Sequence, residues 1–182
     1  MRRTPCARAL AFFLVTGLAA PALAAERGPS TAAERRRAVE ITRRLERAPL
    51  AAKANADRIW LLKWINDIPD IVVRTCAGLL DGLPADDGGK FGRKLFAQSM
   101  FGMTAYMIEH PAKRNDWVAV QTAGIESTLK AYEVLVKAKP AMRWEELDRL
   151  LSVRDQGRLA ELVEAQLEGC GDEHPPGPGE AI

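Results

Sequence analysis

The sequence has 182 residues, with 26 lysines and arginines against 24 aspartates and glutamates. Arg2, Arg3 and Arg8 lie in the first 24 residues, where there is no acidic residue, so the rest of the chain holds 23 basic and 24 acidic residues. This near-neutral balance excludes a strongly basic nucleic-acid-binding domain, and the length favours one domain with its own core.

Residues 1–24 show the order of zones that is typical of a secretory signal peptide. The three arginines lead into an apolar run at 9–20, and the small residues of Pro21-Ala22-Leu23-Ala24 follow it as a cleavage site. The run is too short to span a bilayer, and no later apolar segment reaches that length. We therefore expect a periplasmic or secreted protein whose mature chain begins at Ala25 and has no transmembrane segment.

Beyond this leader, apolar residues recur at helical spacing and strand-like alternation is nearly absent, which predicts an all-α fold. The first expected helix begins at Thr31, which can form a capping box with Glu34, and it ends before Pro49. The second helix is expected over about residues 50–67. It becomes apolar on nearly all sides over residues 59–65, a pattern typical of a helix in the centre of a bundle.

A third helix is predicted to open at Pro69 and Asp70 and to carry Cys76 on its apolar face. The β-branched run Ile71-Val72-Val73 leaves a strand as the alternative at its start. Later helices are expected at about 90–110, from an N-cap at Asn115 to about residue 139, at 143–153 and at 155–168. Short connections between them are typical of antiparallel neighbours.

The fold class that follows is a single-domain, all-α helical bundle of about six to seven helices over residues 30–170, held by one disulfide. Residues 25–29 are expected to form a flexible amino-terminal segment. Residues 171–182 are rich in proline and glycine, so we expect a disordered tail there.

The disulfide is predicted between Cys76 and Cys170, because Cys6 leaves with the leader and an even pair remains. Paired cysteines are typical of proteins in oxidising compartments. Cys170 continues the apolar stripe of Val163 and Leu167, so both thiols are expected to point inward. Two unpaired buried cysteines are the alternative.

Small residues lie inside two of the predicted helices, where a glycine costs about 1 kcal/mol relative to alanine. They predict that the two helices cross closely, with the floor of a ligand groove as the alternative. The residues concerned are Gly92, Ser99, Gly102, Ala105 and Gly124.

Met100, Met103, Met107 and His110 are spaced three, four and three residues apart, which places them within an arc of about 80° on one helix face. Thioether and imidazole ligands suit Cu(I), so this face is a candidate metal site. Ordinary packing is the alternative, because methionine commonly fills apolar cores. No other cofactor is expected.

Six arginines and three glutamates alternate along the first predicted helix, and much of this charge can be paired at i,i+4. A solvated face is one interpretation. Contact with an acidic partner, or with an anionic surface of the cell envelope, is the other, and Arg36, Arg43 and Arg44 are its candidate residues.

Catalytic motifs are missing from the sequence: it has no glycine-rich phosphate loop, no HExxH motif and no cluster of zinc-type cysteines. His110 is the one histidine within the predicted domain, and no local pattern marks a nucleophile beside it. The sequence therefore favours a non-enzymatic, exported protein of the cell envelope that acts through protein–protein interaction. A protein that binds a small ligand or Cu(I), and an enzyme with an unmarked site, are the alternatives.

Overall fold

The computed structural model describes residues 27–80 and 90–173, and within them the fold is all-α, as predicted. The expected signal peptide at 1–24 lies outside these residues, as do residues 174–182 of the tail expected at 171–182; residues 171–173 of that tail lie in a short 3₁₀ helix. The described ranges contain six α-helices: α1 (Ala32–Arg47), α2 (Ala54–Asp67), α3 (Lys90–Glu109), α4 (Trp117–Ala138), α5 (Glu145–Asp155) and α6 (Leu159–Leu167). Four short 3₁₀ helices join or follow them: η1 (Ala77–Leu79), η2 (Pro111–Lys113), η3 (Pro140–Met142) and η4 (Glu168–Glu173).

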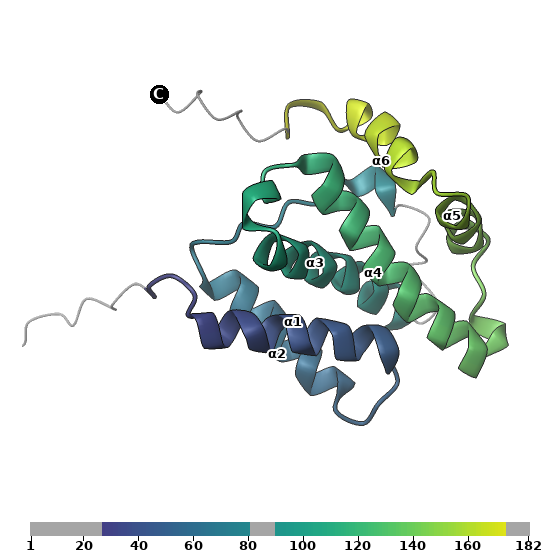
Figure 1. Ribbon diagram of the computed structural model, residues 1–182. Coiled ribbons are helices and arrows are strands. Elements are labelled where there is room, and N and C mark those ends of the chain that lie inside the picture. Colours follow the sequence, from purple (N-terminus) through teal and green to yellow (C-terminus); the bar gives the residue numbers. More distant parts are fainter. Residues whose placement is uncertain (1–26, 81–89, 174–182) are drawn as a thin grey trace, which may run out of the picture.

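Helices α3 and α4 form the centre of the molecule and pack against each other more extensively than any other pair. Figure 1 shows α1 and α2 on one side of this pair and α5 and α6 on the other. One apolar cluster lies among α1, α2 and α3, and a second joins α4, α5, α6 and η1. None of the helices in the described ranges is long and apolar enough to cross a bilayer.

Two helix starts show how local sequence sets the elements. Thr31 Oγ1 accepts a hydrogen bond from the Glu34 amide at 3.2 Å, and Glu34 Oε2 accepts one from the Thr31 amide at 2.8 Å, which is the predicted capping box. The N-cap of α4 is Asp116 and not Asn115, because the Asp116 carboxylate accepts from the Ala119 amide at 3.0 Å. The N-cap, and with it the helix start, therefore lies one residue after the position expected from the sequence.

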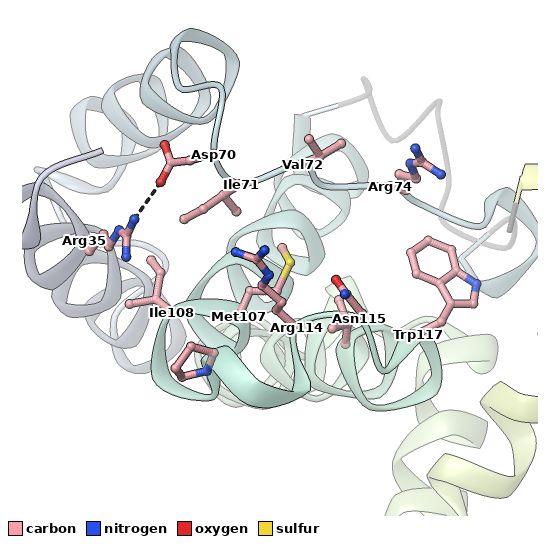
Figure 2. Close-up of a pocket in the computed structure, with 12 residues that line it drawn as sticks. Arg35, Asp70, Ile71, Val72, Arg74, Met107, Ile108, Arg114, Asn115 and Trp117 are labelled. Atoms are coloured by element: carbon pink, nitrogen blue, oxygen red, sulfur yellow. Dashed lines mark hydrogen bonds and ion pairs between the residues drawn. The ribbon is translucent and has the colours of Figure 1, made fainter. Parts of the chain in front are cut away.

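The predicted third helix is wrong: residues 71–76 form no helix, and of the described residues that directly follow them only Ala77–Leu79 are helical, as the short 3₁₀ helix η1. The β-branched side chains disfavour helix here. Figure 2 shows the chain running extended from Asp70 to Arg74, which lets alternate residues face opposite ways. Ile71 and Val73 pack against the first apolar cluster, whereas Val72 is 65% exposed. This extended segment becomes one wall of the cleft described below.

The close crossing of α3 and α4 depends on two glycines, as the small-residue pattern predicts. A Cβ atom on Gly102 would lie 2.4 Å from Ser127 Cβ and 2.8 Å from the Ala123 carbonyl oxygen. A Cβ atom on Gly124 would lie 2.8 Å from Met103 Cγ and 2.9 Å from the Ser99 carbonyl oxygen. All four distances are shorter than real Cβ atoms show, so the helix backbones meet closely at these positions.

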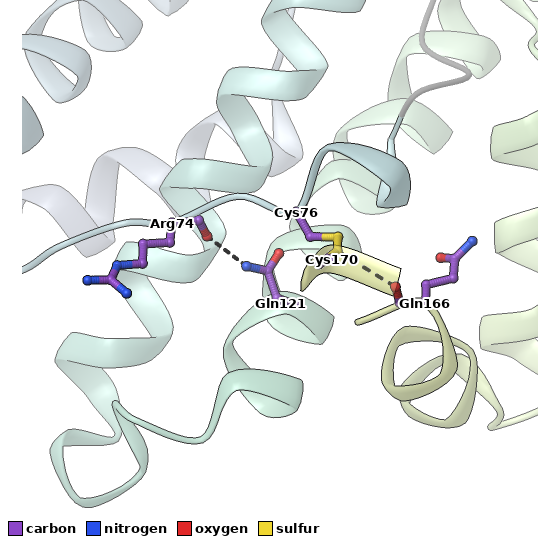
Figure 3. The surroundings of a disulfide bond; sticks show 5 residues. All are labelled: Arg74, Cys76, Gln121, Gln166 and Cys170. Atoms are coloured by element: carbon purple, nitrogen blue, oxygen red, sulfur yellow. Dashed lines mark hydrogen bonds between the residues drawn. A yellow bond between two sulfur atoms is a disulfide. The ribbon is translucent and has the colours of Figure 1, made fainter. Parts of the chain in front are cut away.

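The predicted disulfide is present between Cys76 and Cys170, whose Cα atoms are 6.0 Å apart. Cys76 lies at the end of the extended segment and is buried, and Cys170 lies in η4. Figure 3 shows the bond joining the segment before η1 to the chain that follows α6. The structure thus ties the middle of the sequence to the end of the described chain.

Candidate functional site

A cavity of about 330 Å³ lies between the extended segment and the corner where α3 leads through η2 into α4. Three arginines from separate parts of the chain, Arg35, Arg74 and Arg114, border it, and we call it the arginine cleft. The extended segment and this corner form its two walls, and both contribute apolar side chains to its surface. The residues of that surface are Ile71, Val72, Met107, Ile108, Pro111, Trp117 and Val120.

The first wall begins at Asp70, whose carboxylate is fully engaged. It accepts hydrogen bonds from the amide and hydroxyl of Ser30 and from Nη2 of Arg35, each at 2.7 Å. Burial raises the pKa of Asp70, but the hydrogen bonds from Ser30 and Arg35 outweigh it and hold the pKa below its ordinary value. Asp70 therefore stays ionised at neutral pH and positions Arg35 at one end of the cleft.

The same wall is fixed at its other end by α4. Gln121 Nε2 donates a hydrogen bond to the carbonyl oxygen of Arg74 at 2.7 Å, as Figure 3 shows. Gln121 is buried, so this contact anchors the backbone while the Arg74 side chain remains exposed. The extended segment is thus held at Asp70 and at Arg74, with Ile71 to Val73 between the two anchors.

The second wall is a tight corner. Pro111 lacks an amide hydrogen and ends α3 after Glu109, and hydrogen bonds from Lys113 N to His110 O and from Asp116 N to Lys113 O close the turn. This geometry places Arg114 in the corner, and Figure 2 shows its side chain and that of Met107 directed toward the extended segment. Trp117, the first residue of α4, lies at the end of the cleft near Arg74.

The charges around the cleft do not cancel. Arg35 is paired with Asp70, but in the described part of the chain Arg74 and Arg114 form no ion pair, and both are exposed. A guanidinium group donates to carboxylates in a forked geometry and keeps its proton at any physiological pH. An apolar surface bordered by two unpaired guanidinium groups suits a ligand that combines apolar groups with negative charge.

A second, more open cavity of about 500 Å³ lies between α3 and α4. Its charged residues are of both signs, Arg43, Glu109, Asp116, Glu126 and Lys130, so it has no clear preference for an anionic or a cationic ligand. His110 also lines it and lies against Tyr106, with ring centroids 4.6 Å apart.

The four residues of the predicted Cu(I) face lie in different surroundings. Met103 is buried beneath Gly124, Met107 lines the arginine cleft, and His110 lines the second cavity. Met100 is half-buried. The described residues contain no group of three His, Cys, Asp or Glu side chains that could hold a metal. Methionine thioethers are not among these side chains, so Cu(I) binding stays a prediction.

Two of the three arginines predicted to contact a partner are engaged within the molecule. Arg43 pairs with Glu46 at 2.7 Å and with Glu109 at 2.6 Å, and Arg44 pairs with Asp57 at 2.9 Å. Arg36 is exposed and forms no ion pair with any described residue. The structure therefore leaves Arg36 available and gives the other two a place in the packing of α1.

Sequence reasoning missed the arginine cleft because its charged residues come from three segments that are far apart in the chain. Arg74 was assigned to a helix, and Arg114 lies in a turn that has no recognisable motif. The β-branched run at 71–73 was the one available signal, since an extended segment there brings Arg74 beside Trp117.

Comparison with family models, with curated proteins and with solved structures finds no match for this chain.

Proposed function

We propose that this protein is exported to the cell envelope and binds a protein partner there through the arginine cleft, without catalysing a reaction. The observation that carries the proposal is the pair of guanidinium groups of Arg74 and Arg114, which have no ion-pair partner among the described residues, beside an apolar surface. Charged and apolar groups that converge on one concave site are typical of binding sites. The leader pattern at 1–24 supports export, and a disulfide is typical of oxidising compartments.

The chemistry of the cleft favours binding over catalysis. Its charged side chains are arginines, which do not exchange protons near neutral pH, and Asp70, which is held ionised by Ser30 and Arg35. A general acid or base needs a pKa close to the working pH. These residues are suited to orient an anionic partner and are poorly suited to move a proton.

Affinity capture with charge-reversal variants tests the proposal. The purified mature protein is immobilised and exposed to the solubilised envelope fraction of the source organism, and bound proteins are quantified by mass spectrometry. We expect the wild type to retain a partner that the double variant Arg74→Glu/Arg114→Glu loses, because its carboxylates would repel an acidic surface.

The matched control reverses the same number of charges on α1, in the variant Arg36→Glu/Arg47→Glu. Both residues are exposed and lie outside the arginine cleft. Retention of the partner by this control, with its loss from the cleft variant, supports the proposal. Loss of the partner from the α1 variant alone would place the interface on α1. Retention of the partner by both variants would show that neither surface binds it.

A further inference from the structure

We infer that the arginine cleft takes an extended peptide in which apolar residues alternate with acidic residues, and that the peptide pairs with residues 71–74 as an added strand. The inference rests on the proposed function, because it names the chemistry of the partner at the same cleft. It depends on three features of the structure: an unpaired backbone, an apolar surface and two free cationic groups.

The backbone of the extended segment is the first feature. In the described part of the chain, no backbone–backbone hydrogen bond involves residues 71–75, and the one backbone atom with a side-chain partner is the carbonyl oxygen of Arg74. Extended chain whose amide and carbonyl groups lack protein partners is a template for an incoming strand. The anchors at Asp70 and Gln121 hold this template in place before a ligand arrives.

The apolar surface is the second feature. Val72 is 65% exposed and lies between Ile71 and Val73, which pack inward. Across the cleft, Ile108 and Met107 are half-buried. A peptide strand laid along residues 71–74 would cover exposed apolar area on both walls, and burial of that area would favour binding.

The charges are the third feature, and they define the polar half of the peptide. Arg74 extends from the strand template and Arg114 from the opposite corner, so both walls offer a guanidinium group. Because successive side chains of a strand point to opposite faces, apolar residues can face the cleft surface while the intervening carboxylates meet the arginines. A small inorganic anion would leave the apolar surface uncovered, and an acyl carboxylate would leave the backbone groups unpaired.

Binding of synthetic peptides to the intact protein tests the inference. The probe is a fluorescein-labelled peptide of sequence Val-Glu-Val-Glu-Val-Glu with an amidated end, and its affinity is measured by fluorescence anisotropy. We expect the matched peptide with Gln in place of each Glu to bind at least about tenfold more weakly, which corresponds to 1.4 kcal/mol. The variant Arg114→Gln should reduce the affinity for the Glu peptide and leave that for the Gln peptide unchanged.

Two N-methylated peptides test the strand pairing directly. One carries N-methyl groups at its first, third and fifth residues, and the other at its second, fourth and sixth. A strand that pairs along one edge uses the amide hydrogens of alternate residues. We therefore expect one of the two peptides to lose binding and the other to keep it, while amide hydrogen exchange slows at residues 71–75 of the protein.

Several outcomes would overturn the inference. They are the absence of measurable binding of the Glu peptide at millimolar concentration, equal binding of both N-methylated peptides, and unchanged affinity when Glu is replaced by Gln. Dodecanoate serves as the acyl probe, and its binding in place of the peptides would assign the cleft to acyl carboxylates. The affinity-capture experiment is independent of these probes, because a native partner lost from the Arg74/Arg114 variant would still support binding at the cleft. Melting temperatures of all variants confirm that they fold.

Discussion

Asp70 links the amino-terminal end of α1 to the wall of the arginine cleft. Its carboxylate receives two hydrogen bonds from Ser30 and one from Arg35, although 40 residues of sequence separate Ser30 from Asp70. Hydrogen bonds to an ionised group are stronger than neutral ones. A single side chain thereby fixes the direction in which the chain leaves α2 and begins the extended segment.

Replacement of Asp70 by Asn should lower the free energy of unfolding by about 1 to 3 kcal/mol at pH 7, because a neutral amide accepts these bonds more weakly and fewer of them. The native pKa of Asp70 is depressed, so its stabilisation is present above the pKa of the unfolded chain and is lost as the pH falls through the native pKa. The difference between wild type and variant, measured by urea unfolding, should therefore shrink toward acid pH.

Asp67→Asn is the matched control for this prediction. Asp67 lies three residues earlier and pairs with the exposed Lys63 at 2.8 Å, an i,i+4 contact that is expected to contribute about 0.3 to 0.5 kcal/mol. Equal losses in the Asp67 and Asp70 variants, or a loss in the Asp70 variant that does not change with pH, would contradict the role given to Asp70.

Arg43 belongs to a polar network beneath the α1, α3 and α4 crossing. Glu46 is almost fully buried, with 6% of its side chain exposed, and accepts from Arg43 and from the Ser127 hydroxyl, each at 2.7 Å. Ser127 Oγ also accepts from Gln98 Nε2 at 2.9 Å. A buried carboxylate of this kind needs its partners, because an unpaired charge in the interior is costly.

We predict that Arg43→Met lowers the free energy of unfolding by about 2 kcal/mol or more, since it leaves the Glu46 carboxylate with a hydroxyl donor alone. Arg44→Met is the control, because its exposed pair with Asp57 should contribute about 1 kcal/mol or less. Denaturant unfolding of both variants measures the difference. If Arg44→Met destabilises the protein as much as Arg43→Met does, the buried network is not what distinguishes them.

At the scale of elements, helices with a regular apolar pattern and a clear cap were predicted from the sequence. The segment in which helical spacing coincides with a β-branched run was predicted wrongly. The capping box at Thr31 and the crossing glycines at 102 and 124 are local features that the structure keeps. The segment 70–76 was assigned to a helix because its apolar residues fit helical spacing. Contacts of Asp70 with Ser30 and of Cys76 with Cys170 hold it extended, and both involve residues distant in sequence.

The arginine cleft was not predicted for the same reason. Arg35, Arg74 and Arg114 are brought together only when the 70–76 segment is extended and lies across the end of α3. The periodicity of apolar residues within one helix does not predict contacts between segments that are distant in sequence. The predicted Cu(I) face is the opposite case. Its residues are aligned on α3, but the packing of α4 and of the extended segment around α3 places them in different surroundings.

The α3–α4 crossing gives a prediction at the element scale. Gly102→Ala and Gly124→Ala should each lower the free energy of unfolding by about 1 to 3 kcal/mol, because the added methyl group would force the helix backbones apart. This cost exceeds the gain of about 1 kcal/mol that alanine normally brings within a helix. Gly78→Ala is the control, since a Cβ atom there meets nothing within 4 Å. Thermal unfolding that places Gly102→Ala or Gly124→Ala at or above the wild-type melting temperature would show that the crossing has room for a methyl group.

At the scale of the whole molecule, two apolar clusters lie on either side of the α3–α4 pair. The first contains α1 and α2, and the second contains α5, α6 and η1. The extended segment runs from one to the other: Ile71 packs on the first cluster, and Cys76 belongs to the second. The arginine cleft therefore lies where the two clusters meet, and its shape depends on how they are held together.

The Cys76–Cys170 disulfide holds the end of the described chain against this junction, across 94 positions of sequence. A loop of this size lowers the entropy of the unfolded chain by an amount worth about 4 to 5 kcal/mol in the entropic model. The double variant Cys76→Ser/Cys170→Ser should therefore lose a large part of the net stability of a small domain, and its melting temperature should fall by many degrees.

The measurement compares wild type, oxidised and reduced, with the double serine variant by thermal unfolding. The melting temperature of reduced wild type should approach that of the variant, because both lack the cross-link. The fall in melting temperature is smaller to the extent that packing of α6 against α4 keeps the second cluster folded. Peptide binding then separates the effect of the disulfide on stability from its effect on the arginine cleft. Because Gln121 anchors Arg74 independently, the folded variant should still bind the Glu peptide at low temperature, with its affinity falling as η1 loosens on warming. An unchanged melting temperature would mean that helix packing alone holds the chain end.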